Sequence, residues 1–101
     1  MHPPTSRDVL AAVAAAFEVP PAALPGPGRR ADIAHARFAA VALLTDLCRL
    51  NTSQIGRRLN RNHATVLHAR ARAATLQALG GEFAARLEAA RAALGEARRG
   101  G

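Results

Sequence analysis

The chain has 101 residues, which suits one small domain and leaves no room for a second catalytic module. Half of the residues are apolar, yet only three are aromatic and 26 are alanine, a composition that favours closely packed helices over a sheet. The net charge is +7, and all 14 basic residues are arginine. Lysine Schiff-base chemistry and the lysine of a phosphate-binding P-loop are therefore excluded.

The first predicted helix covers residues 7–18 and follows a short tail, residues 1–6. Apolar residues recur at helical spacing within it. Its start can be capped by Ser6, or by Thr5 with Asp8 at the spacing of a capping box.

A proline-rich loop separates this helix from a second one. Residues 19–28 hold four prolines and two glycines, which predicts a loop. The second helix is predicted over 31–49. One of its faces carries Ile33, Arg37, Ala40, Leu44 and Leu47.

Three further helices are predicted in the second half of the chain. A short helix over 53–59 ends in a tight turn at 60–62, where asparagine can adopt the left-handed conformation. A longer helix follows over 63–79 and stops at two consecutive glycines. The last helix is predicted over 82–98. The fold class is therefore all-α, a compact bundle of about five helices.

The positive charge is concentrated in one stretch of the chain. Residues 47–81 hold six arginines and no acidic residue, whereas residues 1–46 sum to zero and residues 82–101 to +1. A basic block confined to one part of a folded domain indicates a polyanionic partner. A codon bias of a GC-rich genome would explain arginine in place of lysine, but it would not explain the missing acids.

The short helix, the tight turn and the polar second helix form a helix-turn-helix pattern. In such a motif the first helix crosses the phosphate backbone and the second enters the major groove with its N-terminus first. Arginine can read guanine there, asparagine can read adenine, and threonine can offer a methyl group to thymine. Residues 61–65, Arg-Asn-His-Ala-Thr, supply such side chains. The sequence therefore predicts a double-stranded DNA partner.

A specific resemblance lies in the same region. Residues 55–69 read Ile-Gly-Arg-Arg-Leu-Asn-Arg-Asn-His-Ala-Thr-Val-Leu-His-Ala. They resemble the signature of the C-terminal DNA-binding domain of the bacterial replication initiator DnaA, which reads Ile-Gly, a short link, then Gly-Arg-Asp-His-[Ser/Thr]-Thr-Val. The likeness covers about 7–79, including the basic loop and long helix before the signature. It implies a DnaA-type domain over 7–79, then the helix at 82–98 and a tail at 99–101.

The resemblance and the helix-turn-helix geometry together indicate which residues meet the DNA. The residues expected to read bases are Arg61, Asn62, His63, Ala64, Thr65 and His68. The residues expected to contact phosphates or the minor groove are Arg29, Arg30, His35, Arg37, Ser53, Gln54, Arg57, Arg58 and Arg72. The resemblance implies that the DNA partner contains sites similar to the DnaA box.

Several positions depart from the family pattern. The signature Asp is Asn62 here, and asparagine favours adenine where aspartate accepts a hydrogen bond from cytosine. The first Ser/Thr of the signature is Ala64, which can still touch a thymine methyl group. His35 replaces an arginine that reaches the minor groove in the family, and the link before Arg61 is one residue shorter. These changes predict a site preference that differs from the usual box.

The remaining features bear on enzyme activity and location. The chain carries no Walker motif and no paired acid, base and nucleophile, so we expect no catalytic residues, no cofactor and no ATPase activity. His63 and His68 are five residues apart and lack partner ligands, so no metal site is expected. A single cysteine, Cys48, and the absence of a signal peptide or membrane span predict a cytoplasmic, nucleoid-associated protein. We expect a stand-alone regulator of transcription or replication.

Two alternatives remain open at this point. The helix at 82–98 either packs on the domain or forms a weak homodimer, because its apolar seam alternates spacings of four and three. That seam consists of Phe83, Leu87, Ala90, Leu94 and Ala97. The second alternative is functional: the same fold is a helical protein-interaction adaptor whose groove face meets an acidic protein.

Overall fold

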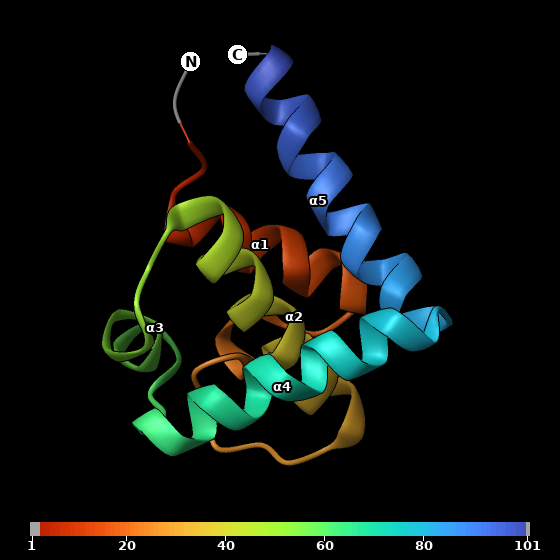
Figure 1. The fold of residues 1–101 in the computed structure, drawn as a ribbon. Coiled ribbons are helices and arrows are strands. Elements are labelled where there is room, and N and C mark those ends of the chain that lie inside the picture. Colours follow the sequence, from red (N-terminus) through yellow and green to blue (C-terminus); the bar gives the residue numbers. More distant parts are fainter. Residues whose placement is uncertain (1–2, 101) are drawn as a thin grey trace.

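The computed structural model describes the backbone of residues 3–100 and the side chains of residues 3–96. Within that range the chain is a helical bundle without strands, so the predicted fold class is confirmed (Figure 1). Its elements are α1 (Ser6–Phe17), the 3-10 turn η1 (Pro21–Ala23), α2 (Ala31–Cys48), α3 (Thr52–Leu59), α4 (His63–Leu79) and α5 (Glu82–Gly100). The turn η1 lies in the segment that the sequence predicted to be a loop. No helix of the described chain is both long and apolar enough to cross a membrane.

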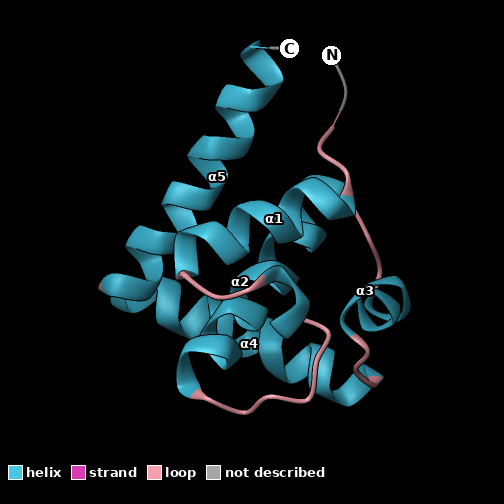
Figure 2. Cartoon of the chain, turned by 180° about the vertical axis from the view of Figure 1, so that it is seen from behind, coloured by secondary structure: helices cyan, strands magenta, loops and turns pink. Residues whose placement is uncertain are grey.

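The helix α2 lies at the centre of the bundle. It packs against α1 on one side and α4 on another, and α5 packs mainly on α1 (Figures 1 and 2). Because it has neighbours on several sides, α2 buries more than one stripe, and Ala36, Ala39, Ala40, Leu43 and Leu44 are all 0 % exposed. Three of these residues are alanines. Because their side chains are small, the backbones of the neighbouring helices can approach α2 closely.

The helix boundaries follow from capping chemistry. Thr5 and Asp8 form a reciprocal capping box at the start of α1, as the sequence indicated. Asn51 and Gln54 form a second one at the start of α3. At the end of α3, Asn60 adopts the left-handed conformation, with φ of 54°. That conformation ends the short helix where the tight turn was predicted.

The N-terminal segment and the apolar seam of α5 pack on the bundle. Pro4 is buried, and its carbonyl accepts a hydrogen bond of 3.1 Å from the Cys48 thiol at the end of α2. The seam of α5 is directed inward, since Phe83, Leu87, Ala90 and Leu94 are at most 7 % exposed. The side chain of Ala97, the last member of the predicted seam, lies outside the described residues.

Candidate nucleic-acid interface

The helices α3 and α4 are held together by a close backbone approach. Ile55, Leu59 and Val66 are buried between the two helices and the rest of the bundle. The backbone N–H of Arg61 donates to the Gly56 carbonyl at 2.9 Å. A Cβ atom at Gly56 would lie only 2.6 Å from the Arg61 carbonyl oxygen, so the turn can fold back on α3 only above a glycine. This contact explains the glycine in the Ile-Gly pair.

Asn62 has a structural role that the sequence prediction did not include. It is the N-cap of α4, and its Oδ1 accepts a 2.8 Å hydrogen bond from the Thr65 backbone N–H. The predicted reading of adenine would use this same oxygen as an acceptor. The amide nitrogen Nδ2 is the group left for donation to a base.

The start of α4 presents a continuous polar surface. His63, Ala64, Thr65 and His68 are all exposed, at one end of the helix. The structure brings these predicted base-reading residues together, and their contact with DNA stays a prediction. The backbone N–H groups of the first turn of a helix also face outward and favour anions.

Residues of α3 adjoin this surface. Ser53 and Arg57 line a polar hollow between α3 and α4 together with His63. Ser53 and Arg57 are both exposed. Thr52 and Asn60 line the same hollow, and neither was among the residues predicted to contact DNA. The helix that was expected to cross the phosphate backbone therefore lies beside the helix that was expected to enter the groove.

The proline-rich loop reaches the other side of α4. Arg29 lines a second hollow with Thr65 and His68, although it is 36 and 39 residues away from them in the sequence. Phe38 and Val41 of α2 contribute apolar lining to this hollow. Arg29 is exposed, so its guanidinium extends the basic surface past α4. Arg72 is exposed further along α4.

Arg37 was predicted to contact a phosphate group, but the structure places it inside the fold. Its residue is only 9 % exposed, and its guanidinium donates to four backbone carbonyls of the loop. The acceptors are Leu24 at 2.7 Å, Ala23 at 2.8 Å, Gly26 at 2.6 Å and Gly28 at 2.5 Å. Burial lowers the pKa of Arg37, and so does the positive charge of Arg61. Arg37 therefore fixes the loop and is not available to a phosphate group.

Arg61 also differs from its predicted role. Its Nη1 donates at 3.0 Å to the carbonyls of Leu59 and Asn60, at the C-terminal end of α3. Its Nη2 donates at 2.6 Å to Gly26, the carbonyl that Arg37 also uses. A cation is stabilised at this end of a helix because the last carbonyls lack partners. In this structure Arg61 supports the turn and the loop instead of extending toward a base.

His35 lines a hollow at the far end of α4, and its predicted minor-groove contact stays a prediction. It is half-buried, and its ring lies 5.8 Å from that of Phe38 and 6.0 Å from that of Phe83, edge to face with the latter. Phe83 belongs to α5, which lies beyond residues 7–79, the range of the family resemblance.

Three other predicted phosphate contacts have partners within the chain. Gln54 accepts a hydrogen bond from the Asn51 backbone through Oε1, as part of the capping box. Arg58 donates through Nε to the Ser6 hydroxyl at 3.2 Å. Arg30 forms an ion pair of 3.1 Å with Asp32, and 71 % of its side chain is exposed. Such exposed contacts are weak, so Arg30 and Arg58 can exchange them for a phosphate group.

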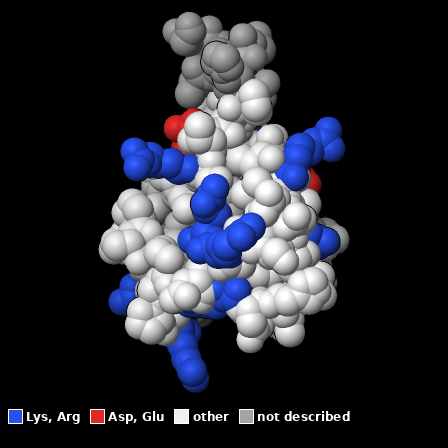
Figure 3. Space-filling model, turned by 90° about the vertical axis from the view of Figure 1, so that its left-hand side faces the viewer, with Lys and Arg blue, Asp and Glu red and all other residues white. Residues whose placement is uncertain are grey.

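The surface around α3 carries a strong positive charge. Figure 3 shows basic side chains gathered over the face of α3, while the acidic side chains visible in that view lie at its margin. Residues 47–81 contain no acid, so the described carboxylates all come from α1, α2, α5 and their ends. In the part of the chain that the structure describes, no three His, Cys, Asp or Glu side chains are placed to hold a metal ion. The electrostatics of this surface suit a polyanion.

The segment that carries α3 and the start of α4 matches a known protein family. The family described as "Bacterial dnaA protein helix-turn-helix" matches residues 6–72. The chain belongs to this family. It is a DNA-binding helix-turn-helix domain of the DnaA type, as the sequence predicted. The matched range includes α1, α2, α3 and the first part of α4, and it does not include α5.

Two curated relatives of this DnaA-type chain are proteins named as chromosomal replication initiators. The chromosomal replication initiator protein DnaA of Deinococcus deserti is 39 % identical over 62 residues, which is 61 % of this chain. The protein of the same name from Thermomicrobium roseum is 46 % identical over 65 residues, which is 63 % of this chain. Each match covers 14 % of the relative, so the chain spans only a small share of the length of these proteins.

Proposed function

We propose that this domain binds double-stranded DNA at sites similar to the DnaA box, with the N-terminus of α4 in the major groove. The observation that carries the proposal is the exposed polar start of α4, which is flanked by arginines from two separate segments. Arg57 lies beside it on α3, and Arg29 lies on its other side in the loop. No acidic residue occurs between residues 47 and 81 to oppose a phosphate backbone.

The proposal divides the surface into two roles. His63, Thr65 and His68 read base edges, and Ala64 packs on a thymine methyl group. The phosphate contacts come from Ser53, Arg29, Arg30, Arg57, Arg58 and Arg72, whose residues are all exposed. Arg61 and Asn62 act mainly by holding the turn, and the Nδ2 of Asn62 can add a hydrogen bond to a base.

By occupying such sites the protein would act as a regulator of transcription or of replication at the nucleoid. We assign no catalytic group, ATPase activity or cofactor to these residues. The homodimer through residues 82–98 lacks support, because the described part of its apolar seam is used inside the bundle. The alternative is that the domain is a protein-interaction adaptor. In that case the same surface would bind an acidic protein instead of DNA.

The experiment is a titration of duplex DNA, with the bound sequences first selected from a random pool. If about six phosphates are neutralised, the logarithm of the affinity should fall with the logarithm of the salt concentration with a slope near −5. His63→Ala and Thr65→Ala should each weaken binding to the selected duplex by about 1–3 kcal/mol, with little change on random duplex. Arg57→Ala should weaken both alike and reduce the slope by about 1.

A matched control is Arg91→Ala, which removes the same charge on α5, where Arg91 pairs with Asp46 and Glu88. It should leave the affinity for either duplex nearly unchanged. The proposal fails if the protein shows no duplex binding at low salt. It also fails in its base-reading part if the His63 and Thr65 variants lose the same affinity on selected and random DNA.

A further inference from the structure

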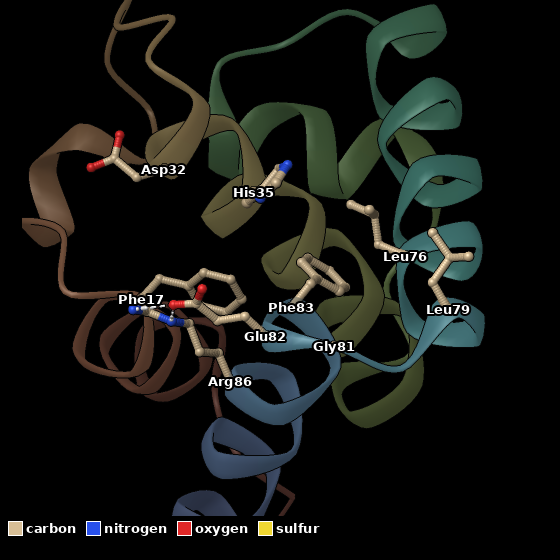
Figure 4. Close-up of a pocket in the computed structure, with 9 residues that line it drawn as sticks. All are labelled: Phe17, Asp32, His35, Leu76, Leu79, Gly81, Glu82, Phe83 and Arg86. Carbon is tan, nitrogen blue, oxygen red and sulfur yellow. Dashed lines mark hydrogen bonds and ion pairs between the residues drawn. The ribbon is translucent and has the colours of Figure 1, made fainter.

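A third hollow of the molecule lies at the far end of α4, away from the proposed DNA surface. It is formed where the end of α4 meets α1, α2 and the start of α5, and its volume is about 410 Å³. Figure 4 shows Phe17, His35, Leu76 and Phe83 arranged around it, and the rings of Phe17 and Phe83 are 5.7 Å apart. Its size is in the range of hollows that receive small ligands or a few side chains.

The mouth of this hollow carries one large apolar side chain that is exposed to solvent. Leu79 is the last residue of α4 and lines the hollow, yet it is 76 % exposed. Leu67 is the only other large apolar residue exposed in the described chain, at 43 %. The glycines that follow Leu79 leave the mouth open, since a Cβ atom at Gly80 or Gly81 would meet nothing within 4 Å. The hollow and Leu79 together offer apolar surface that the fold itself does not cover.

The charge of the rim is opposite to that of the DNA surface. Asp32 and Glu82 line the hollow with Arg86, whose guanidinium bonds to Glu82 at 2.7 Å and to Glu18 at 3.2 Å. The Glu18 and Glu82 side chains are 79 % and 76 % exposed, whereas that of Arg86 is 30 % exposed. The carboxylates therefore protrude and the guanidinium lies beneath them. Arg30 also pairs with Asp32 at 3.1 Å, so three carboxylates and two guanidinium groups give the rim a net charge of −1, in a chain of net charge +7. This local excess of acid disfavours DNA and favours a cationic partner.

We propose that this hollow is a docking site for a basic segment of a partner protein, which inserts a large apolar side chain between Leu79, Phe83 and His35. The segment places its arginine or lysine side chains against the carboxylates of Glu18, Asp32 and Glu82. Leu79 is 16 residues beyond His63 on the same helix, which corresponds to about 24 Å along the axis. The partner and the DNA can therefore be bound at the same time.

The test uses the full chain as bait for a displayed library of random 12-residue peptides, counter-selected against the Leu79→Gln variant. Enriched peptides should combine a large apolar residue with arginine or lysine. Synthesised peptides should lose at least tenfold in affinity to Leu79→Gln and less than twofold to Leu67→Gln, the matched exposed leucine. Their affinity should also fall with Glu82→Gln and with salt, while Leu79→Gln keeps its affinity for the selected DNA duplex within about twofold.

Several results would overturn the proposal. One is a library that yields no binder dependent on Leu79. Another is a set of enriched peptides that are acidic, or that compete with DNA, because these would use the surface of α3 and α4. A third is self-association of the chain that Leu79→Gln abolishes, since the occupant would then be a second copy. The library selection and the peptide affinity measurements contain no DNA, so a failure of DNA binding would leave both of them unaffected.

Discussion

Replacing Arg37 by methionine tests whether this arginine acts inside the fold instead of on DNA. Methionine keeps much of the length and the apolar stem but removes all five guanidinium N–H donors. Four loop carbonyls then lose this donor at once, although Gly26 still accepts from Arg61 and Ala23 from the Gly26 backbone N–H. These carbonyls belong to the segment that carries Arg29, so the loop and one edge of the proposed DNA surface depend on the same side chain.

The cost of this change can be worked from the burial of each acceptor. The hydrogen bond to Leu24 is buried, and an acceptor left there without a partner costs about 1–3 kcal/mol. The other three carbonyls are partly buried and can regain water, so each loses only about 0.5–1.5 kcal/mol. Relief of the desolvation of the guanidinium offsets part of this loss. We expect Arg37→Met to lower the free energy of unfolding by about 3 kcal/mol, and Tm by roughly 12–24 °C.

The assay is urea unfolding followed by circular dichroism, with Arg29→Ala as the matched control. Arg29 is exposed, so its loss should change the free energy of unfolding by less than about 0.5 kcal/mol while weakening DNA binding. Arg37→Lys should recover less than half of the loss, because one ammonium group cannot reach acceptors spread from Ala23 to Gly28. If Arg37→Met is as stable as Arg29→Ala, the loop is not held in the way the hydrogen bonds indicate.

Three further predictions concern the turn and the thiol. Gly56→Ala should destabilise the protein by about 1–3 kcal/mol in urea unfolding, because the new Cβ would lie 2.6 Å from the Arg61 carbonyl; unchanged stability would mean that the turn moves freely. Asn62→Ala should cost about 1 kcal/mol through loss of the cap while Asn62→Asp costs little, and equal losses would exclude the capping explanation. Burial and the charge of Asp8 raise the pKa of Cys48, so the thiolate is disfavoured in the fold. Stability should therefore fall as the pH rises through and beyond about 9 in urea unfolding, and Cys48→Ala should not show this fall.

The sequence predicted the helices well because their ends are marked by local chemistry. Thr5, Asn60 and Gly80 each ended or started an element within a residue or two of the expected position. Such signals act over three or four residues, so they can be read without knowing the fold. The short turn η1 lacked a comparable signal, since prolines predict both loops and 3-10 turns.

The site was predicted less completely, and Arg37 shows why. The helical periodicity already placed it on the apolar face with Ile33 and Leu44, which is a signal for burial. The resemblance favoured a DNA contact, because an arginine in a basic domain is expected to face a phosphate. The carbonyls that decide the matter come from a loop 9 to 14 residues earlier, and no periodicity reveals their positions. The hollow beside Leu79 was missed for a similar reason, since the crossing of α5 determines what covers the end of α4.

The signature of the family combines two kinds of residue in this structure. Gly56, Arg61 and Asn62 hold the turn through a close backbone contact, carbonyl bonds and a helix cap. His63 and Thr65 are exposed and free to meet a ligand. Replacing the signature Asp by Asn62 preserves a good cap, so the fold tolerates the change whatever base lies opposite. The presence of the turn-forming residues is therefore evidence for the helix-turn-helix itself, whereas the preferred DNA sequence depends on the exposed positions from His63 onward.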